Sequence, residues 1–142
     1  MTLPQNITLS KRRSDFLKRV VFAAVLIVVL LSFNTFCLFT IGKIKNEATI
    51  KLEELYEHAC FESPDKLAAK CEEFTEYWLS EHHTLCLIVR HDLLDQVTIS
   101  VSRFIPLAKF GENGELSAEI LRSKILIEEI WDSERPLLRN IF

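Results

Sequence analysis

One uninterrupted apolar segment restricts what this chain can fold into more than any other feature. The segment "VVFAAVLIVVLLSFNTFCLFTI", residues 20–41, contains no charged residue, glycine or proline. As a helix it would extend about 33 Å, at about 1.5 Å per residue, which is enough to cross a hydrocarbon core of about 30 Å. A helix in a soluble core usually keeps a polar face, and this segment has none. We therefore predict a transmembrane helix over residues 20–41.

The charges on either side of this segment predict its orientation. Residues 1–19 carry five basic residues and one acidic residue, whereas Lys43 and Lys45 alone follow closely on the other side. The basic excess favours a cytoplasmic N-terminus, residues 1–19, and an extracytoplasmic domain, residues 42–142. That outer part carries 12 basic and 19 acidic residues, and the acidic excess argues against a nucleic-acid partner.

A cleaved signal peptide is the alternative interpretation of the apolar segment. However, the run is longer than an ordinary signal-peptide core, and "CLFTIGKIKN" at its end contains no small-x-small cleavage site. The sequence therefore favours an uncleaved single-pass anchor in the plasma membrane, with the lipid bilayer as its first partner.

Beyond the segment, apolar residues recur at steps of three and four, which is the spacing of amphipathic helices. Residues 44–59 predict a helical stalk that continues the transmembrane helix. Ser63 is suited to an N-cap and Pro64 to the first position of the next helix, which we expect to reach about Leu79. "SEHHT" then predicts a break or kink.

A third helix is expected to carry an apolar stripe from Leu87 to Ala108. Pro106 should kink this helix or end its regular part, because proline lacks the amide for the internal hydrogen bond. "KFGENGEL" predicts a loop with Gly111 at a helix C-terminus, before a last helix. The predicted fold class is all-α: an N-terminal transmembrane helix that continues into a small antiparallel extracytoplasmic helical bundle.

Three short motifs in the outer part resemble a known family. They are Trp78, "HDLLD" from His91 to Asp95, and "LLRNIF" from Leu137 to Phe142. In this order they resemble a bacterial family of single-span, membrane-anchored helical proteins catalogued as domain of unknown function 4363. The chain departs from the family pattern at Leu93, where an acidic residue is more usual. The resemblance implies the topology and an association with larger membrane proteins, and it implies no activity.

His91 and Asp95 lie one helical turn apart within an apolar run, so an imidazole–carboxylate contact is geometrically easy. A metal site would need further donors, and the available ones do not follow a zinc-binding spacing. These donors are His58, Cys60, Cys71, His82, His83 and Cys86. We therefore predict that His91 and Asp95 form structural polar contacts between packed helices, with Arg103 and Asn140 as candidate partners.

The sequence contains no pattern typical of a catalytic site. Its three glycines form no phosphate-binding loop, and Ser100 and Ser102 lie in a predicted helix without a nucleophile elbow. We expect neither enzymatic activity nor a cofactor. The three cysteines beyond the segment leave open one disulfide with a spare thiol, an intermolecular bridge, or no bridge, and we interpret them as small buried hydrophobic residues.

Ser32, Asn34 and Thr35 are polar residues inside the apolar segment. An amide in hydrocarbon needs another helix or a wet cavity, so these residues predict association with a partner helix, from a second copy or from another membrane protein. Two functions follow. The first is a non-enzymatic accessory or interaction protein of a larger membrane complex, and the alternative is an extracytoplasmic ligand- or metal-binding sensor-like domain.

Overall fold

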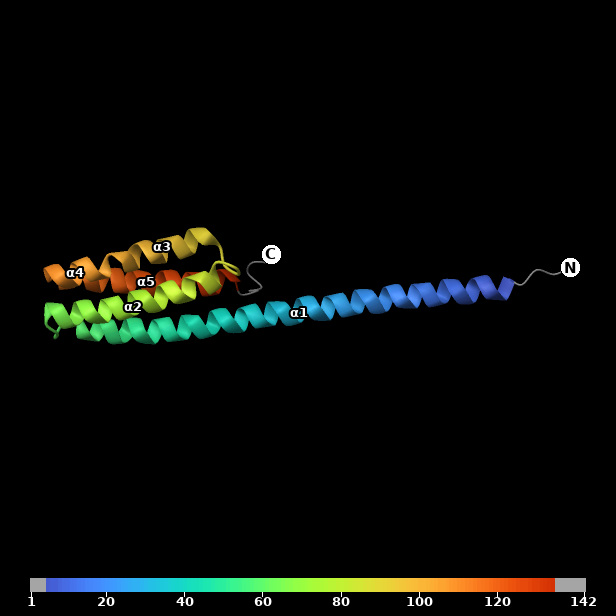
Figure 1. Cartoon of the computed structure of the whole chain (residues 1–142), viewed down its shortest axis with the longest axis horizontal. Helices are drawn as coiled ribbons and strands as arrows, with labels where there is room; N and C mark the ends of the chain where they lie inside the picture. Colours follow the sequence, from blue (N-terminus) through green and yellow to red (C-terminus); the bar gives the residue numbers. More distant parts are fainter. Residues whose placement is uncertain (1–4, 135–142) are drawn as a thin grey trace. The chain divides into compact units, whose positions relative to one another are not determined.

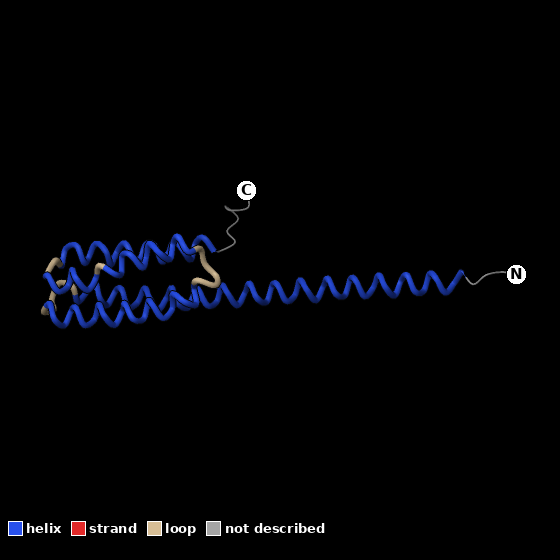
Figure 2. The backbone as a smooth tube through the Cα atoms, turned by 45° about the horizontal axis from the view of Figure 1, so that its top comes forward, coloured by secondary structure: helices blue, strands red, loops and turns tan. Residues whose placement is uncertain are grey.

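A computed structural model describes the backbone of residues 5–134 and the side chains of residues 16–134. All regular structure in this range is helical, which confirms the all-α prediction (Figure 2). Five helices follow in chain order: α1 (Gln5–His58), α2 (Pro64–Leu85), α3 (His91–Ser102), α4 (Phe104–Phe110) and α5 (Asn113–Glu134). They form two structural units, residues 1–37 and residues 38–142.

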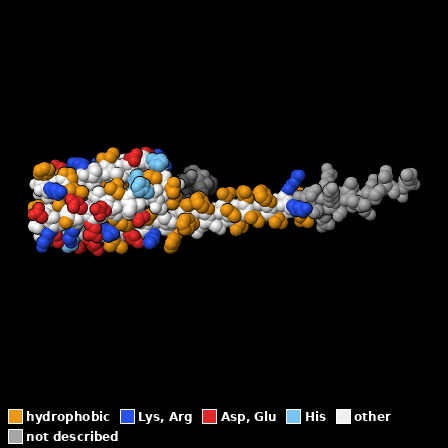
Figure 3. Space-filling view, in the orientation of Figure 1, with side chains coloured by type: hydrophobic (Ala, Val, Ile, Leu, Met, Phe, Trp, Pro, Cys, Tyr) orange, Lys and Arg blue, Asp and Glu red, His pale blue; other side chains and the backbone are white. Residues whose placement is uncertain are grey.

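The first unit is the N-terminal part of α1. From Phe16 to Phe36 every side chain is exposed, although most of them are apolar (Figure 3). One helical stretch, Phe16–His58, is long and apolar enough to cross a membrane, and the most apolar window within it has a mean hydropathy of 2.6. Because α1 runs without interruption to His58, the predicted continuation of the apolar helix into a stalk is confirmed.

The second unit is a bundle formed by the C-terminal part of α1, by α2, by α3 with α4, and by α5 (Figure 1). The loop after α1 reverses the chain, so α2 returns antiparallel to α1. Near this loop Lys70 pairs with Glu62, and further along α2 the Tyr77 hydroxyl donates to the carbonyl of Ile44 at 3.4 Å. α5 lies against α1 as well, where Lys124 contacts Glu53 at 2.6 Å.

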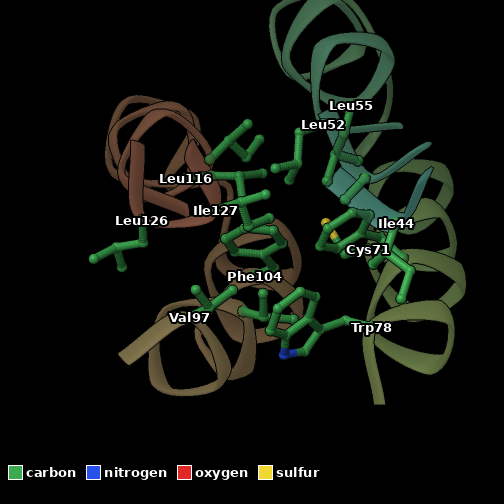
Figure 4. Packing of buried hydrophobic residues seen from close by; sticks show 14 of the residues in the cluster. Ile44, Leu52, Leu55, Cys71, Trp78, Val97, Phe104, Leu116, Leu126 and Ile127 are labelled. Atoms are coloured by element: carbon green, nitrogen blue, oxygen red, sulfur yellow. The ribbon is translucent and has the colours of Figure 1, made fainter. Parts of the chain in front are cut away.

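Buried side chains from every helix meet along the bundle axis (Figure 4). The predicted stalk stripe is part of this core and comprises Ile44, Ala48, Leu52, Leu55 and Ala59. Trp78 of α2 is 1% exposed and donates through its indole nitrogen to the Thr98 hydroxyl at 3.0 Å. The rings of Phe74 and Phe104 stack with centroids 5.8 Å apart. These contacts join α2 to α3 and α4.

The helix ends agree with the sequence prediction at two positions. Ser63 has the extended backbone of an N-cap, with Pro64 in the first helical turn. Gly111 ends α4 in the left-handed conformation, with φ 73°, which glycine adopts without steric cost.

Two other predicted boundaries are displaced. The break at "SEHHT" is wrong, because α2 continues to Leu85 and the turn follows at residues 86–90. Leu87 consequently lies in the turn rather than on the stripe, and is 88% exposed. The interruption expected from Pro106 occurs at Arg103, between α3 and α4. Proline has no amide to donate to the carbonyl four residues earlier, at Ser102, where α3 ends.

Candidate functional site

His91 and Asp95 do not form the predicted buried polar contact. His91 is the first residue of α3, and both side chains are exposed. Leu94 and Val97 are 0% exposed, so the apolar side of α3 faces the core. The side that carries His91 and Asp95 consequently faces solvent. Asn140, the other predicted contact residue, lies outside the described residues.

The buried polar network of the bundle lies one to two turns further along, between α3 and α5. Ser100 is 1% exposed, Ser123 0% and Glu119 7%. The Ser100 hydroxyl donates to Glu119 Oε2 at 2.5 Å, and the Ser123 hydroxyl donates to Ser100 Oγ at 3.0 Å. Arg103 pairs with Glu119 Oε1 through one guanidinium nitrogen and reaches Glu115 at 3.5 Å through the other.

This network satisfies each buried polar side chain with a partner from the facing helix, so it specifies the register between α3 and α5. Sequence reasoning suggested Arg103 but missed the other three residues. A signal was present, because Ser100 lies between Val97 and Phe104 at the stripe spacing. Glu119 and Ser123 lie in the same way between Leu116 and Ile127. A polar residue at a stripe position is buried and requires a partner.

The polar residues of the apolar helix fall into two classes. Ser32 donates its hydroxyl to the carbonyl of Val28 at 2.8 Å, and Thr35 donates to Leu31 at 2.9 Å. Their donors are therefore satisfied within the helix. Asn34 is exposed, and its side-chain amide makes no hydrogen bond with any residue that the structure describes.

Helical geometry separates these residues further. At about 100° per residue, Ser32 and Thr35 lie roughly 60° apart around the axis, whereas Asn34 lies roughly 160° from Ser32. The three predicted association residues therefore do not share one face of α1.

A cleft of about 100 Å³ lies between α1 and α2. Its lining residues are Lys51, Glu54, Leu55, His58, Lys70, Glu73 and Phe74. At its end, Glu62 Oε1 lies 3.2 Å from His58 Nδ1 and 3.4 Å from Lys70 Nζ. The second oxygen, Glu62 Oε2, is buried without a hydrogen-bond partner among the described residues. The cleft thus brings two basic side chains, His58 and Lys70, close to a carboxylate that is only half satisfied.

The four cysteines are free thiols in different environments. Cys37 and Cys71 are buried and Cys60 is exposed. Burial, together with the neighbouring Glu72 carboxylate, raises the pKa of the Cys71 thiol to about 12, so this cysteine is a packing residue. Cys86 lies 3.5 Å from His82 Nδ1. Within residues 16–134, no three histidine, cysteine or acidic side chains converge as metal ligands would.

Comparison with known proteins identifies one family. A family described as a domain of unknown function (DUF4363) matches residues 38–141, which includes the described bundle. No curated protein and no solved structure matches the chain.

Proposed function

The chain belongs to the family of domain of unknown function DUF4363, whose description assigns no activity, and we propose that it is a membrane-anchored, non-enzymatic accessory protein that binds a partner helix through its apolar segment. The N-terminus lies in the cytoplasm, and the helical bundle lies on the outer side of the plasma membrane. The observation that carries this proposal is Asn34, an exposed side-chain amide without a partner among the described residues, in a predominantly apolar stretch of helix.

Asn34 belongs to a row of residues at alternating steps of three and four, which places them on one side of a helix. The row consists of Val20, Ala23, Ile27, Leu30 and Asn34, all of them exposed. This spacing suits left-handed packing against a second helix, with the small Ala23 permitting close approach and Asn34 supplying an interhelical hydrogen bond. Such a bond contributes about 1 kcal/mol in a membrane, so it selects a partner more than it drives binding.

The orientation is tested with reporters fused to either end of the chain. An enzyme that is active only outside the cytoplasm should be active when fused after Phe142 and inactive when fused before Met1. The reverse pattern would refute the orientation and place Cys60, Cys71 and Cys86 in a reducing compartment.

The partner helix is tested by Asn34→Leu in the full-length chain, extracted in a mild detergent. Association, measured by cross-linking between differently tagged copies and by recovery of co-purified membrane proteins, should weaken roughly fivefold, which corresponds to about 1 kcal/mol. Ser32→Leu is the matched control, because that hydroxyl is satisfied within α1 and lies on the other side of the helix. If both variants associate like the wild type, Asn34 is merely a tolerated polar residue and the proposal is wrong.

A ligand-binding sensor is the second candidate function, and the cleft between α1 and α2 is the observation that favours it. The half-satisfied carboxylate of Glu62 and the imidazole of His58 are potential cation ligands there. Elemental analysis of protein purified without chelator tests this function. Stoichiometric zinc that is lost in His58→Ala would support the sensor function over the accessory-protein function.

A further inference from the structure

The turn between α2 and α3 presents an aliphatic side chain to solvent. Leu87 is 88% exposed, whereas Val89, two residues later, is 5% exposed and belongs to the core. Ile88 is partly buried and packs against the same core. The turn is thus anchored on one side by Val89 and Ile88 while Leu87 points outward.

The backbone of this turn is already satisfied internally. The amides of Cys86 and Leu87 donate to the carbonyls of His82 and Thr84 at 2.9 and 3.3 Å. The next two amides, of Ile88 and Val89, both donate to Leu85, at 2.9 and 2.8 Å. An apolar environment penalises unpaired amides, and this turn exposes none at residues 86–89.

The turn lies at the end of the bundle where the apolar segment of α1 finishes. α2 is antiparallel to α1, and Leu85 at its C-terminus lines the same small apolar void as Ile41. Gly42 is the next residue of α1 and approaches the ring of Trp131, near the C-terminal end of α5. Leu85 is the last residue of α2, and Leu87 follows it in the turn. Leu87 therefore lies at the level of Ile41, the last residue of the apolar run, or further toward this end of the bundle.

Other exposed side chains near this end of the bundle are apolar, basic or imidazole groups. Phe39, two residues before Ile41, is 73% exposed. The polar neighbours along the chain are His83 and Arg90, both exposed, and Arg90 pairs with Asp92 at 2.6 Å. Aliphatic and aromatic tips beside basic and imidazole groups suit the boundary between acyl chains and headgroups.

We propose that the α2–α3 turn is a second membrane contact, in which Leu87 enters the acyl-chain boundary of the outer leaflet and seats the bundle directly on the lipid surface. This inference rests on the proposed membrane anchorage through residues 20–41. The lipid is favoured as occupant because the turn is level with the end of a segment that itself requires lipid, and because the amides of residues 86–89 need no further partner.

The test places a fluorescent reporter at each end of the bundle in full-length protein reconstituted into phosphatidylcholine vesicles. Leu87→Trp probes the turn, and Phe61→Trp is the matched control, because Phe61 is 90% exposed in the loop between α1 and α2 at the opposite end. Wild-type protein supplies the background signal of Trp78 and Trp131. The vesicles contain phosphatidylcholine brominated near the ester end of its acyl chains, and flotation measures membrane association separately.

The added fluorescence of Leu87→Trp should be quenched at least twofold more strongly than that of Phe61→Trp. Equal, weak quenching of both variants in protein that floats with the vesicles would overturn the second contact and leave the anchor intact. Failure of the wild-type protein to float would overturn the anchor and the second contact together.

Discussion

Removing Arg103 should destabilise the bundle far more than removing an ordinary surface cation. Arg103→Ala leaves the carboxylate of Glu119, whose side chain is 9% exposed, with the Ser100 hydroxyl as its one remaining side-chain partner among the described residues. A buried charge that loses its counter-charge cannot recover full hydration, so the cost is mainly that of the remaining carboxylate.

The magnitude follows from the exposure of the two partners. Breaking a fully buried ion pair costs about 3–5 kcal/mol. The Arg103 side chain is 48% exposed, so water can reach the position that it vacates, and the cost should fall to about 2 kcal/mol. For a bundle of this size, that loss lowers the melting temperature by roughly 10 °C.

Thermal unfolding of the full-length protein in detergent measures this effect through tryptophan fluorescence, because Trp78 is buried in the bundle core. Lys109→Ala is the matched control, since Lys109 pairs with Glu72 at 3.3 Å and both side chains are more than half exposed. Such surface pairs contribute about 0–1 kcal/mol, so the control should shift the transition by a few degrees at most.

A double-mutant cycle then shows whether the residues act as one network. Glu119→Gln retains an acceptor for Ser100 and removes the charge that Arg103 neutralises. The double variant should therefore lose less stability than the sum of the two single variants. Strictly additive losses, or an Arg103→Ala transition no lower than that of Lys109→Ala, would refute the reasoning.

Four further perturbations test the packing and the backbone conformation of the bundle. Burial raises the pKa of Cys71 from 9.0 to about 12, so the unfolded chain loses this proton at a lower pH than the folded protein does. The free energy of unfolding should therefore fall as the pH rises above about 9. Denaturant titrations at several pH values should show a smaller fall for Cys71→Ala. Iodoacetamide should modify the exposed Cys60 in the native protein and Cys71 only after unfolding, as mass spectrometry of peptides would show. Gly42→Ala should lower the free energy of unfolding by about 1–3 kcal/mol, because an added Cβ would lie 3.0 Å from the Trp131 ring. Gly111→Ala should lower it by about 1 kcal/mol, because the φ of this residue is 73°. Denaturant-induced unfolding measures both losses.

The sequence by itself determined the features that depend on the local backbone and on apolar periodicity. The apolar helix, its continuation as a stalk and the helix start at Pro64 follow from residues a few positions apart. The left-handed Gly111 follows from the same short-range chemistry. Family membership was likewise legible from short motifs.

The tertiary structure decided which polar side chains are buried and where the second turn lies. His91 and Asp95 have the spacing of a contact pair, but spacing does not say which side of α3 faces the core. The network between Ser100 and Glu119 joins residues 19 positions apart and requires α3 to lie against α5. Residues 80–84, "SEHHT", stay helical, because α2 continues to Leu85, whose side chain is buried in the core near Ile41. Such outcomes depend on which helices meet, and the free energy of burying side chains against distant residues outweighs the weak local preference for a break.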